Sequence, residues 1–578
     1  MSLHCLRSKL KEYKQIVVSD FSVFLAIVVT ITYPCFLFLK RSIFPDTSFD
    51  SVNYHFFLGK NGFENFPLFF KPNEFYPLGI HSFNPFSDII GHGFYLILGY
   101  RLGTITSLLF LIGTIILGFI IIRTLFSSSK KRFFIAIMIP PAFLVNEGLF
   151  QVGTFFTDNI HAFFVMCYTF FILRYIDTES KFSYSSLVIF GLLGGVIMTK
   201  LTNIIYFVPL FILTIFMLIY KHCMLDKCLY REIFKKCVFY IVVVIAVNFS
   251  MFYNFSLSQN PIFPLYNSVF HSEYYPDVSF HFNFGPTNLK EILFYPIYAI
   301  QKPVLLGEVK DMFPDMKLIY IFIYVLISSI VLFYRGCYFS KQEKVLLFIF
   351  FSSFLLWQVQ FGYSRYGIFL ELLGGMLSIV LVNKILFSPH KWYIEKILTI
   401  IFIMIVLSQS WNIINFNYTY DISWRPNVTF EEWKKSFFSM SMFQKYTYIN
   451  KDESEKLKDI DVVFQCLNPS SVYFSTIREL NNLPLLNFDQ QNNGLMTLDS
   501  DFIRKRNNRL THGTMSKNVN FVSIFRKKSD VYGTKEEETC DRILMENGAE
   551  IDKRFEIDNF VGNKSDVLKV IVGRYNAN

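Results

Sequence analysis

Long apolar stretches alternate with short polar segments along the first 415 residues. Runs of spanning length lie near residues 16–39, 102–126, 133–150, 159–175, 183–199, 202–220, 237–254, 318–334, 345–360, 367–386 and 397–414. An α-helix of about 20 apolar residues crosses the hydrocarbon core of a bilayer. The first run lacks a small-residue cleavage site, so we read it as a retained helix rather than a signal peptide. The pattern predicts an α-helical polytopic membrane protein with about eleven transmembrane helices.

The composition agrees with lipid as the solvent. Of the 578 residues, 52% are hydrophobic and only 17% are charged, whereas a soluble domain carries roughly 25% charged residues. The formal net charge of +10 does not indicate a nucleic-acid partner, because the cations flank the apolar runs. That placement is typical of the positive-inside rule.

The cationic clusters predict the orientation of the chain. They lie near residues 9–14, 130–132, 221–236, 335–344 and 384–396. All five fall on one side when eleven spans alternate, and this side is expected to be cytoplasmic. The N-terminus is then inside, and a first outer loop covers about residues 40–100. Within that loop, the short amphipathic segment 86–100 is predicted to be an interfacial helix.

The region from 416 to 578 has a different character. Strand-like runs at 460–466, 519–525 and 567–572 alternate with helical stretches such as 537–547, which predicts a small soluble α/β domain outside the cytoplasm. Residues 1–415 form the transmembrane domain. Cys466 and Cys540 alone fall in the polar region, and export would permit a disulfide between them. The cysteines show no CxxC spacing, and the chain has no dinucleotide fingerprint or P-loop.

Carboxylates follow the first apolar run directly. Asp46 and Asp50 are four residues apart, as are Asp50 and Tyr54, so these positions share a face if the segment is helical. A partly desolvated carboxylate at the membrane edge can act as a general base toward a hydroxyl. The alternative is that Asp46 or Asp50 caps a short interfacial helix. Spacing alone leaves both interpretations open.

Three further ionisable residues lie at predicted outer ends of spans. Asp158 could bind a cation, orient an acceptor or cap a helix. Lys200 and Arg365 are isolated outer cations that break the charge bias, and a phosphate ligand is one reason for them to be there. The alternatives are snorkelling of Lys200 to lipid head groups and an ion pair of Arg365 with Glu371 or a neighbouring carboxylate.

Metal binding is not predicted. His55, His81 and His92 lie in one loop, but their spacings match no standard zinc motif. No cofactor motif is present, and a divalent cation beside the carboxylates is left open.

Several segments together resemble the GT-C superfamily of polytopic membrane glycosyltransferases. The matches, in family order, are Asp50-Ser-Val-Asn-Tyr-His55, Thr154-Phe-Phe-Thr-Asp158, the Gly191 to Gly195 span ending in Lys200-Leu-Thr, the turn from Asn260 to Pro264, and Arg365-Tyr366. They cover about residues 15–415, and the tail has no such match.

The resemblance implies an inverting glycosyltransferase that uses a polyprenyl-phosphate-linked sugar outside a bacterial inner membrane. The acceptor would be a cell-surface glycan, lipid or protein. By position, Asp50 becomes the general base, Asp158 a supporting acid, and Lys200 and Arg365 the phosphate ligands. Tyr54, His55, His81 and Tyr366 would line the substrate site. Many relatives carry adjacent acidic residues in the first loop, so Asp46 is the alternative base.

Three other functions remain open. An O-antigen-type polymerase or ligase would use a lipid-pyrophosphate donor and outer-loop arginines, without a critical first-loop aspartate. A transporter of a lipid-linked sugar would place charges in mid-span and often shows two similar halves, whereas no repeat is visible here. A structural scaffold with an exported binding tail would leave the polar residues at the membrane edge dispensable.

Overall fold

A computed structural model describes most of the chain. It covers residues 21–48, 50–64, 84–126, 132–178, 183–225, 230–263, 265–273, 277, 286, 288–302, 316–388, 392–419, 429–466, 471–481, 483, 485–487, 518–526, 533–546, 548–558, 561 and 567–576.

Helices occupy every predicted apolar run. In chain order they are α2 (Phe21–Arg41), α5 (Ile105–Leu125), α6 (Arg132–Phe143) with α7 (Asn146–Phe150), α8 (Asp158–Ile176), α9 (Tyr184–Met198), α10 (Ile204–Leu225), α11 (Tyr230–Val247) with α12 (Ser250–Ser258), α16 (Lys317–Tyr334), α17 (Lys341–Gln360), α18 (Ile368–Leu386) and α19 (Tyr393–Thr419). Between α12 and α16 lie the short helices α13 (Asn267–Phe270), α14 (Leu289–Leu293) and α15 (Tyr295–Gln301).

Not every predicted span has full length. Within the described ranges, 8 helices are long and apolar enough to cross a membrane, or up to 9 if α11 and α12, bent by 68°, form one span. The helix α9 has only 15 residues. The helix α6 has 12 residues and contains Pro140 and Pro141, which remove backbone donors near its end. The long apolar helices within the described ranges nevertheless identify the chain as an integral membrane protein.

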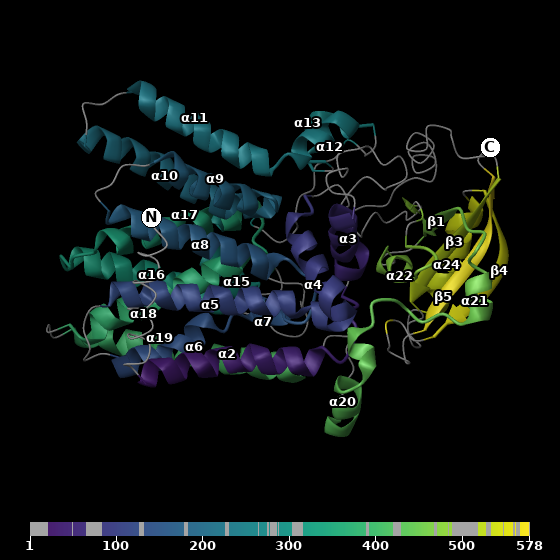
Figure 1. Cartoon of the computed structure of the whole chain (residues 1–578). Helices are drawn as coiled ribbons and strands as arrows, with labels where there is room; N and C mark the ends of the chain where they lie inside the picture. Colours follow the sequence, from purple (N-terminus) through teal and green to yellow (C-terminus); the bar gives the residue numbers. More distant parts are fainter. Residues whose placement is uncertain are drawn as a thin grey trace.

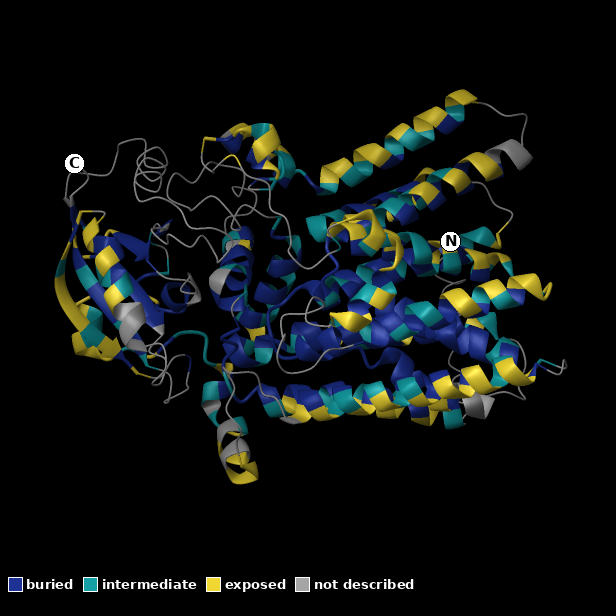
Figure 2. Cartoon of the chain, turned by 180° about the vertical axis from the view of Figure 1, so that it is seen from behind, coloured by how far each residue is buried: buried dark blue, intermediate teal, exposed yellow. Residues whose placement is uncertain are grey.

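The outward faces of the helices are apolar. Val29, Phe216, Val242, Ile330 and Met404 are among the exposed large hydrophobic side chains, and exposed positions follow the outer sides of the helices in Figure 2. A soluble protein seldom exposes so much contiguous apolar surface. These faces are suited to contact with lipid.

One end of the bundle is closed by elements that run across it. The π-helix η1 (Ser51–His55), α3 (Phe56–Glu64) and α4 (Phe86–Gly103) lie between the spans and the C-terminal sheet (Figure 1). The segment predicted to be an interfacial helix is α4. Its backbone departs from helical geometry at Gly99, where φ is 82°. A Cβ atom there would lie 2.5 Å from the backbone of Phe443, so glycine permits the chain after the spans to pack against α4.

The C-terminal region is a mixed five-stranded sheet with helices. Its elements are α20 (Phe430–Phe437), η8 (Met440–Phe443), α21 (Lys451–Glu455), β1 (Val462–Gln465), α22 (Ser471–Ser475), β2 (Leu485–Asn487), β3 (Asn518–Arg526), α24 (Gly533–Glu546), β4 (Ala549–Ile557) and β5 (Leu568–Asn576). The strand order is β2-β1-β3-β5-β4. The strands β1–β2 and β1–β3 pair in parallel, and the other neighbours pair antiparallel. The predicted small sheet domain is confirmed.

The two faces of this sheet have different partners. Val462 and Phe464 share a core with α24, whereas Val463 belongs to the cluster that contains α22 and the first outer segment. In that second cluster Phe57 stacks edge-on with Phe474 at 6.1 Å between ring centroids, and Lys60 Nζ donates to the carbonyl of Asn481. The sheet domain therefore packs directly on the segment that closes the bundle.

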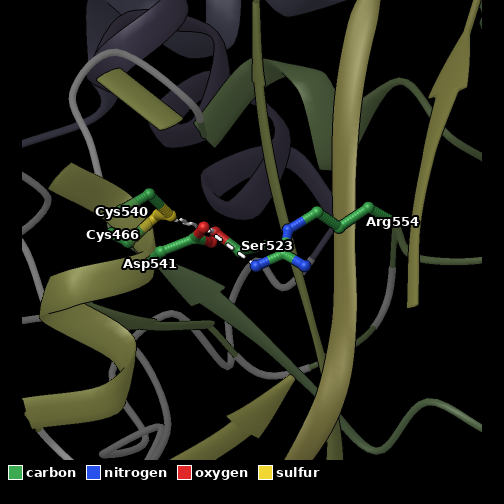
Figure 3. The surroundings of a disulfide bond; sticks show 5 residues. All are labelled: Cys466, Ser523, Cys540, Asp541 and Arg554. Atoms are coloured by element: carbon green, nitrogen blue, oxygen red, sulfur yellow. Dashed lines mark hydrogen bonds and ion pairs between the residues drawn. A yellow bond between two sulfur atoms is a disulfide. The ribbon is translucent and has the colours of Figure 1, made fainter. Parts of the chain in front are cut away.

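A disulfide joins Cys466, just after β1, to Cys540 on α24 (Figure 3). Their Cα atoms are 5.3 Å apart, and the Ser523 hydroxyl lies 3.0 Å from Cys466 Sγ. The ion pair between Arg554 and Asp541, at 2.9 Å, lies beside it. Structural disulfides are typical of oxidising compartments outside the cytoplasm.

We predict that Gly99→Ala destabilises the contact between α4 and the C-terminal region. The new methyl group would clash with Phe443, and the positive φ disfavours alanine, which together cost on the order of 1–3 kcal/mol. Gly93→Ala on the same helix is the matched control, since nothing lies within 4 Å of its added Cβ. Thermal unfolding in detergent should show a lower midpoint for Gly99→Ala only; equal midpoints would contradict this packing.

Candidate active site

Side chains from four separate elements meet at the end of the bundle that is closed by α3 and α4. Asp50 precedes η1, Asp158 is the first residue of α8, Lys200 follows α9 just before η5 (Leu201–Asn203), and Arg365 lies on η7 (Ser364–Gly367) before α18. Arg365 Nε donates to Asp158 Oδ2 at 3.0 Å and its Nη1 donates to Asp50 Oδ2 at 2.5 Å. Lys200 Nζ donates to Asp158 Oδ1. We call these four residues the charged cluster.

Asp158 is the centre of this charged cluster. Besides Arg365 and Lys200, Gln151 Nε2 donates to its Oδ2 at 3.1 Å. The N-cap of α8 is Thr157, and no side chain makes a capping bond there. Asp158 therefore holds two cations rather than capping the helix, while its place in the first turn still suits the helix dipole.

The two first-loop carboxylates have different environments. Asp46 is fully buried and accepts from the Ser48 backbone N–H at 3.0 Å, the Ser48 hydroxyl at 2.6 Å and the Phe155 N–H at 2.8 Å. Asp50 makes no capping bond to η1, and its side chain is 17% exposed. Asp50 stands at the N-cap position of η1 but makes no capping bond, so its contacts do not support the helix-capping interpretation, whereas Asp46 fixes a local turn.

The environment of Asp50 keeps it ionised. Burial raises the pKa of Asp50, but the charges of Arg365, His55 and Lys200, with the hydrogen bond from Arg365, outweigh burial and hold the pKa below its ordinary value. A carboxylate in this state accepts a proton poorly until Arg365 is drawn away from it.

Aromatic rings flank the charged cluster. The guanidinium carbon of Arg365 lies 4.4 Å from the centre of the Phe156 ring, and Lys200 Nζ lies 5.6 Å from that of Tyr366. Tyr54 packs against His55 with ring centroids 4.3 Å apart. Such faces stabilise cations and exclude water. Tyr54, His55 and Tyr366 thus lie beside the cluster, while His81 falls outside the described residues.

The structure separates other candidates from the cluster. Glu371, one of the carboxylates considered as a partner for Arg365, pairs instead with buried Lys317 at 2.8 Å, and Arg365 pairs with Asp50 and Asp158. His92 packs among aromatic rings of Phe56 and Tyr95, and burial with nearby lysine charge lowers its pKa to about 3. Among the residues that the structure describes, no three His, Cys, Asp or Glu side chains form a metal-binding group.

The sequence-based interpretation missed Asp88, Gln151 and His161. Asp88, on α4, lies 2.5 Å from His55 Nδ1. His161 Nε2 lies 3.1 Å from the Ser87 hydroxyl and 3.2 Å from that of Thr199. The polar Ser87-Asp88 pair at the start of an amphipathic segment was the available signal for this contact.

A cavity of about 790 Å³ lies at the opposite end of the bundle. It is lined by Thr124, Ile176–Thr178, Tyr220, Lys221, Tyr338 and Ser340–Gln342. Lys221 there donates to the carbonyls of Tyr175 and Thr178 at the end of α8. This cation is already used to cap a helix, and the cavity does not contain the charged cluster.

The fold and this site define a polytopic membrane protein with a buried acid–base cluster at one end of its bundle. No protein-family model matches the chain, and no curated protein matches it. Two solved structures of ArnT from Cupriavidus metallidurans are similar to it, one in the apo state and one bound to undecaprenyl phosphate. Both are 12% identical, with 95% of this chain and 97% of theirs covered, at TM-scores of 0.46 and 0.48 respectively.

Proposed function

We propose that the chain is a membrane glycosyltransferase of the GT-C type that takes a sugar from a polyprenyl-phosphate carrier. The observation that supports this most strongly is the charged cluster itself. Lys200 and Arg365 reach the same carboxylate from two different elements, at the same end of the bundle. A phosphate can compete with Asp158 and Asp50 for these donors, and the planar fork of arginine is well suited to phosphate oxygens.

The exposed fractions indicate where the substrate enters. The side chains of Asp50 and Lys200 are each 17% exposed, whereas those of Arg365 and Asp158 are 6% and 7% exposed. The donor phosphate would meet Lys200 first and then draw Arg365 away from Asp50. Asp158 would hold Lys200 and the Nε of Arg365 while the Nη1 of Arg365 leaves Asp50.

This exchange would prepare Asp50 for proton transfer. Arg365 is the largest of the influences that lower the pKa of Asp50, so its movement toward phosphate raises the proton affinity of the carboxylate. The acceptor hydroxyl then attacks the anomeric carbon, its proton goes to Asp50, and the electron pair of the broken C–O bond stays on the lipid phosphate. Attack from the opposite side inverts the configuration.

The alternative functions fit these contacts less well. A transporter needs ionisable groups near mid-span, yet all four members of the cluster lie at ends of helices. A polymerase or ligase without a first-loop aspartate would give no reason for Asp50 to bind Arg365. We therefore take Asp50 as the base, with Asp46 as a residue that holds the loop.

The site would face the outside of the cell. Lys221, Arg335, Lys341 and Lys384 lie at the other end of the helices, as the positive-inside rule requires of a cytoplasmic face. The disulfide in the sheet domain also supports an outer location. Reporter fusions after Lys341 should read cytoplasmic, and fusions after Asn450 should read exported. A cytoplasmic signal after Asn450 would place the charged cluster on the cytoplasmic side of the membrane and contradict this orientation.

The donor site can be tested by binding of undecaprenyl phosphate to the full chain in nanodiscs. Lys200→Ala and Arg365→Lys should each weaken binding about 10- to 150-fold, because a charge-assisted contact is worth about 1.5–3 kcal/mol. Arg365→Lys keeps the charge that Asp158 needs but loses the planar fork. Lys384→Ala, at the far end, is the control and should bind normally. Unchanged affinity in both cluster variants would remove them from the site.

The base can be tested with Asp50→Asn, which keeps the size of the side chain but removes its proton affinity. Sugar transfer in membranes supplied with polyprenyl-phosphate-linked sugar should fall about 100- to 10,000-fold, while binding of undecaprenyl phosphate persists. Asp46→Asn should chiefly lower the thermal midpoint of unfolding, because the amide cannot accept all three hydrogen bonds that the buried carboxylate accepts. If Asp46→Asn abolishes transfer without loss of stability and Asp50→Asn does not, the roles are reversed.

A further inference from the structure

His55 is a buried histidine whose Nε2 has no hydrogen-bond partner among the residues that the structure describes. The residue is 4% exposed, and its Nδ1 lies 2.5 Å from Asp88 Oδ1. Its Nε2 is buried without a hydrogen bond to any described residue. Tyr54 packs on the ring at 4.3 Å and Phe156 at 5.8 Å between centroids. Because Arg365 lies over the same Phe156 ring, His55 borders the charged cluster.

The charges around His55 determine which atom carries the proton. In the cluster, the carboxylates of Asp50 and Asp158 are balanced by Lys200 and Arg365. The other buried pair is Asp88–His55, and a net charge on this pair would be unfavourable because it is buried. Burial also raises the pKa of Asp88, although the charge of His55 opposes this.

A neutral pair can be written in two ways. Either Asp88 is ionised and the imidazole is doubly protonated, or Asp88 is protonated and donates to Nδ1. In both forms Nε2 carries a hydrogen, since neutral imidazole has one N–H. His55 Nε2 is therefore a hydrogen-bond donor. A ligand that binds to it must be a hydrogen-bond acceptor, above all an anion.

We propose that His55 Nε2 is a third ligand for the phosphate of the lipid-linked donor, with Asp88 as its positioning residue. This inference rests on the proposed function, because it takes the donor phosphate to lie at Lys200 and Arg365. No proton leaves His55 in the reaction. As the C–O bond to the sugar breaks, the phosphate gains a negative charge, and the N–H bond to its oxygen becomes stronger.

Two substitutions at His55 separate this role from a structural one. The amide of His55→Asn reaches the position of Nδ1 and can still bond to Asp88, but it leaves nothing at Nε2. The amide of His55→Gln reaches the position of Nε2 and can donate to a phosphate oxygen, but it loses Asp88. If His55 only held Asp88, the asparagine would be the better replacement. If His55 binds the phosphate, the glutamine is the better one.

The measurement is the dissociation constant of undecaprenyl phosphate for the full chain in nanodiscs. We expect His55→Asn to weaken binding about 10-fold or more and His55→Gln to stay within about 3-fold of the wild type. Similar thermal midpoints would show that both variants are folded. Equal or reversed effects of the two variants would overturn the assignment, and so would a change confined to the KM of the acceptor.

A double-mutant cycle tests Asp88 as a positioning residue. Asp88→Asn should weaken phosphate binding in the wild type but have no further effect in His55→Gln, which does not use Asp88. A structural role would give the same loss in both backgrounds. This second outcome would remove Asp88 from the proposal.

The pH dependence of binding gives an independent readout. Burial raises the pKa of Asp88, so binding to the wild type should weaken as the pH rises and Asp88 loses its proton, and this component should vanish in His55→Gln, which does not use Asp88. The charged and titratable groups that act on His55 or on its neighbours come from five elements. They are Asp50 and Tyr54 before and in η1, Asp88 on α4, Asp158 and His161 on α8, Lys200 after α9, and Arg365 and Tyr366 on η7. A His55→Gln profile identical to that of the wild type would contradict the proposal.

Failure of this inference can be distinguished from failure of the proposed function. If the wild type does not bind undecaprenyl phosphate, the function itself is wrong. If the wild type binds it and Lys200→Ala weakens binding, but His55→Asn behaves like the wild type, only the role of His55 is wrong.

Discussion

The interaction on which the rest of this structure depends is the convergence of Lys200 and Arg365 on Asp158. Removing ions from water is unfavourable unless each is paired and hydrogen-bonded. Here one carboxylate accepts from Arg365, Lys200 and Gln151, and Arg365 extends the pairing to Asp50. The pairing ties the start of η1, the start of α8, the end of α9 and η7 together. Breaking one member would leave a buried charge uncompensated, so the geometry of the helix ends and the chemistry of the site are set by the same contacts.

The elements around the charged cluster serve to enclose it. The elements η1, α3 and α4 lie across the end of the bundle, and the sheet domain packs on their outer side (Figure 1). Asp46 fixes the chain before η1 to the 151–157 turn through Phe155, and Gly99 lets the chain after the last span approach α4. The sheet domain therefore supports the segment that carries Asp50 and His55. This role could not be inferred from the residues of the sheet domain alone.

Sequence patterns were sufficient for the parts of the structure that depend on local physics. Apolar length located the helices, charge bias grouped Asp50, Asp158, Lys200 and Arg365 on one side, and strand-like alternation revealed the sheet domain. The spacing could not show that Asp46 and Asp50 differ, because the difference comes from the Phe155 N–H, which is remote in sequence. Asp88 was missed for the same reason: its partner His55 lies 33 positions away. Helix lengths were also less regular than the apolar runs, owing to Pro140 and Pro141 in α6 and the bend between α11 and α12.

We propose that the charged cluster receives the phosphate of a polyprenyl carrier, and the most direct test is a cryo-electron microscopy map of the full chain with undecaprenyl phosphate in nanodiscs. We expect phosphate density within about 3 Å of the side-chain nitrogens of Lys200 and Arg365, with Arg365 displaced from Asp50. Density at mid-span in a cavity open to both sides, or at the opposite end beside Lys221 with Arg365 still bound to Asp50, would contradict it.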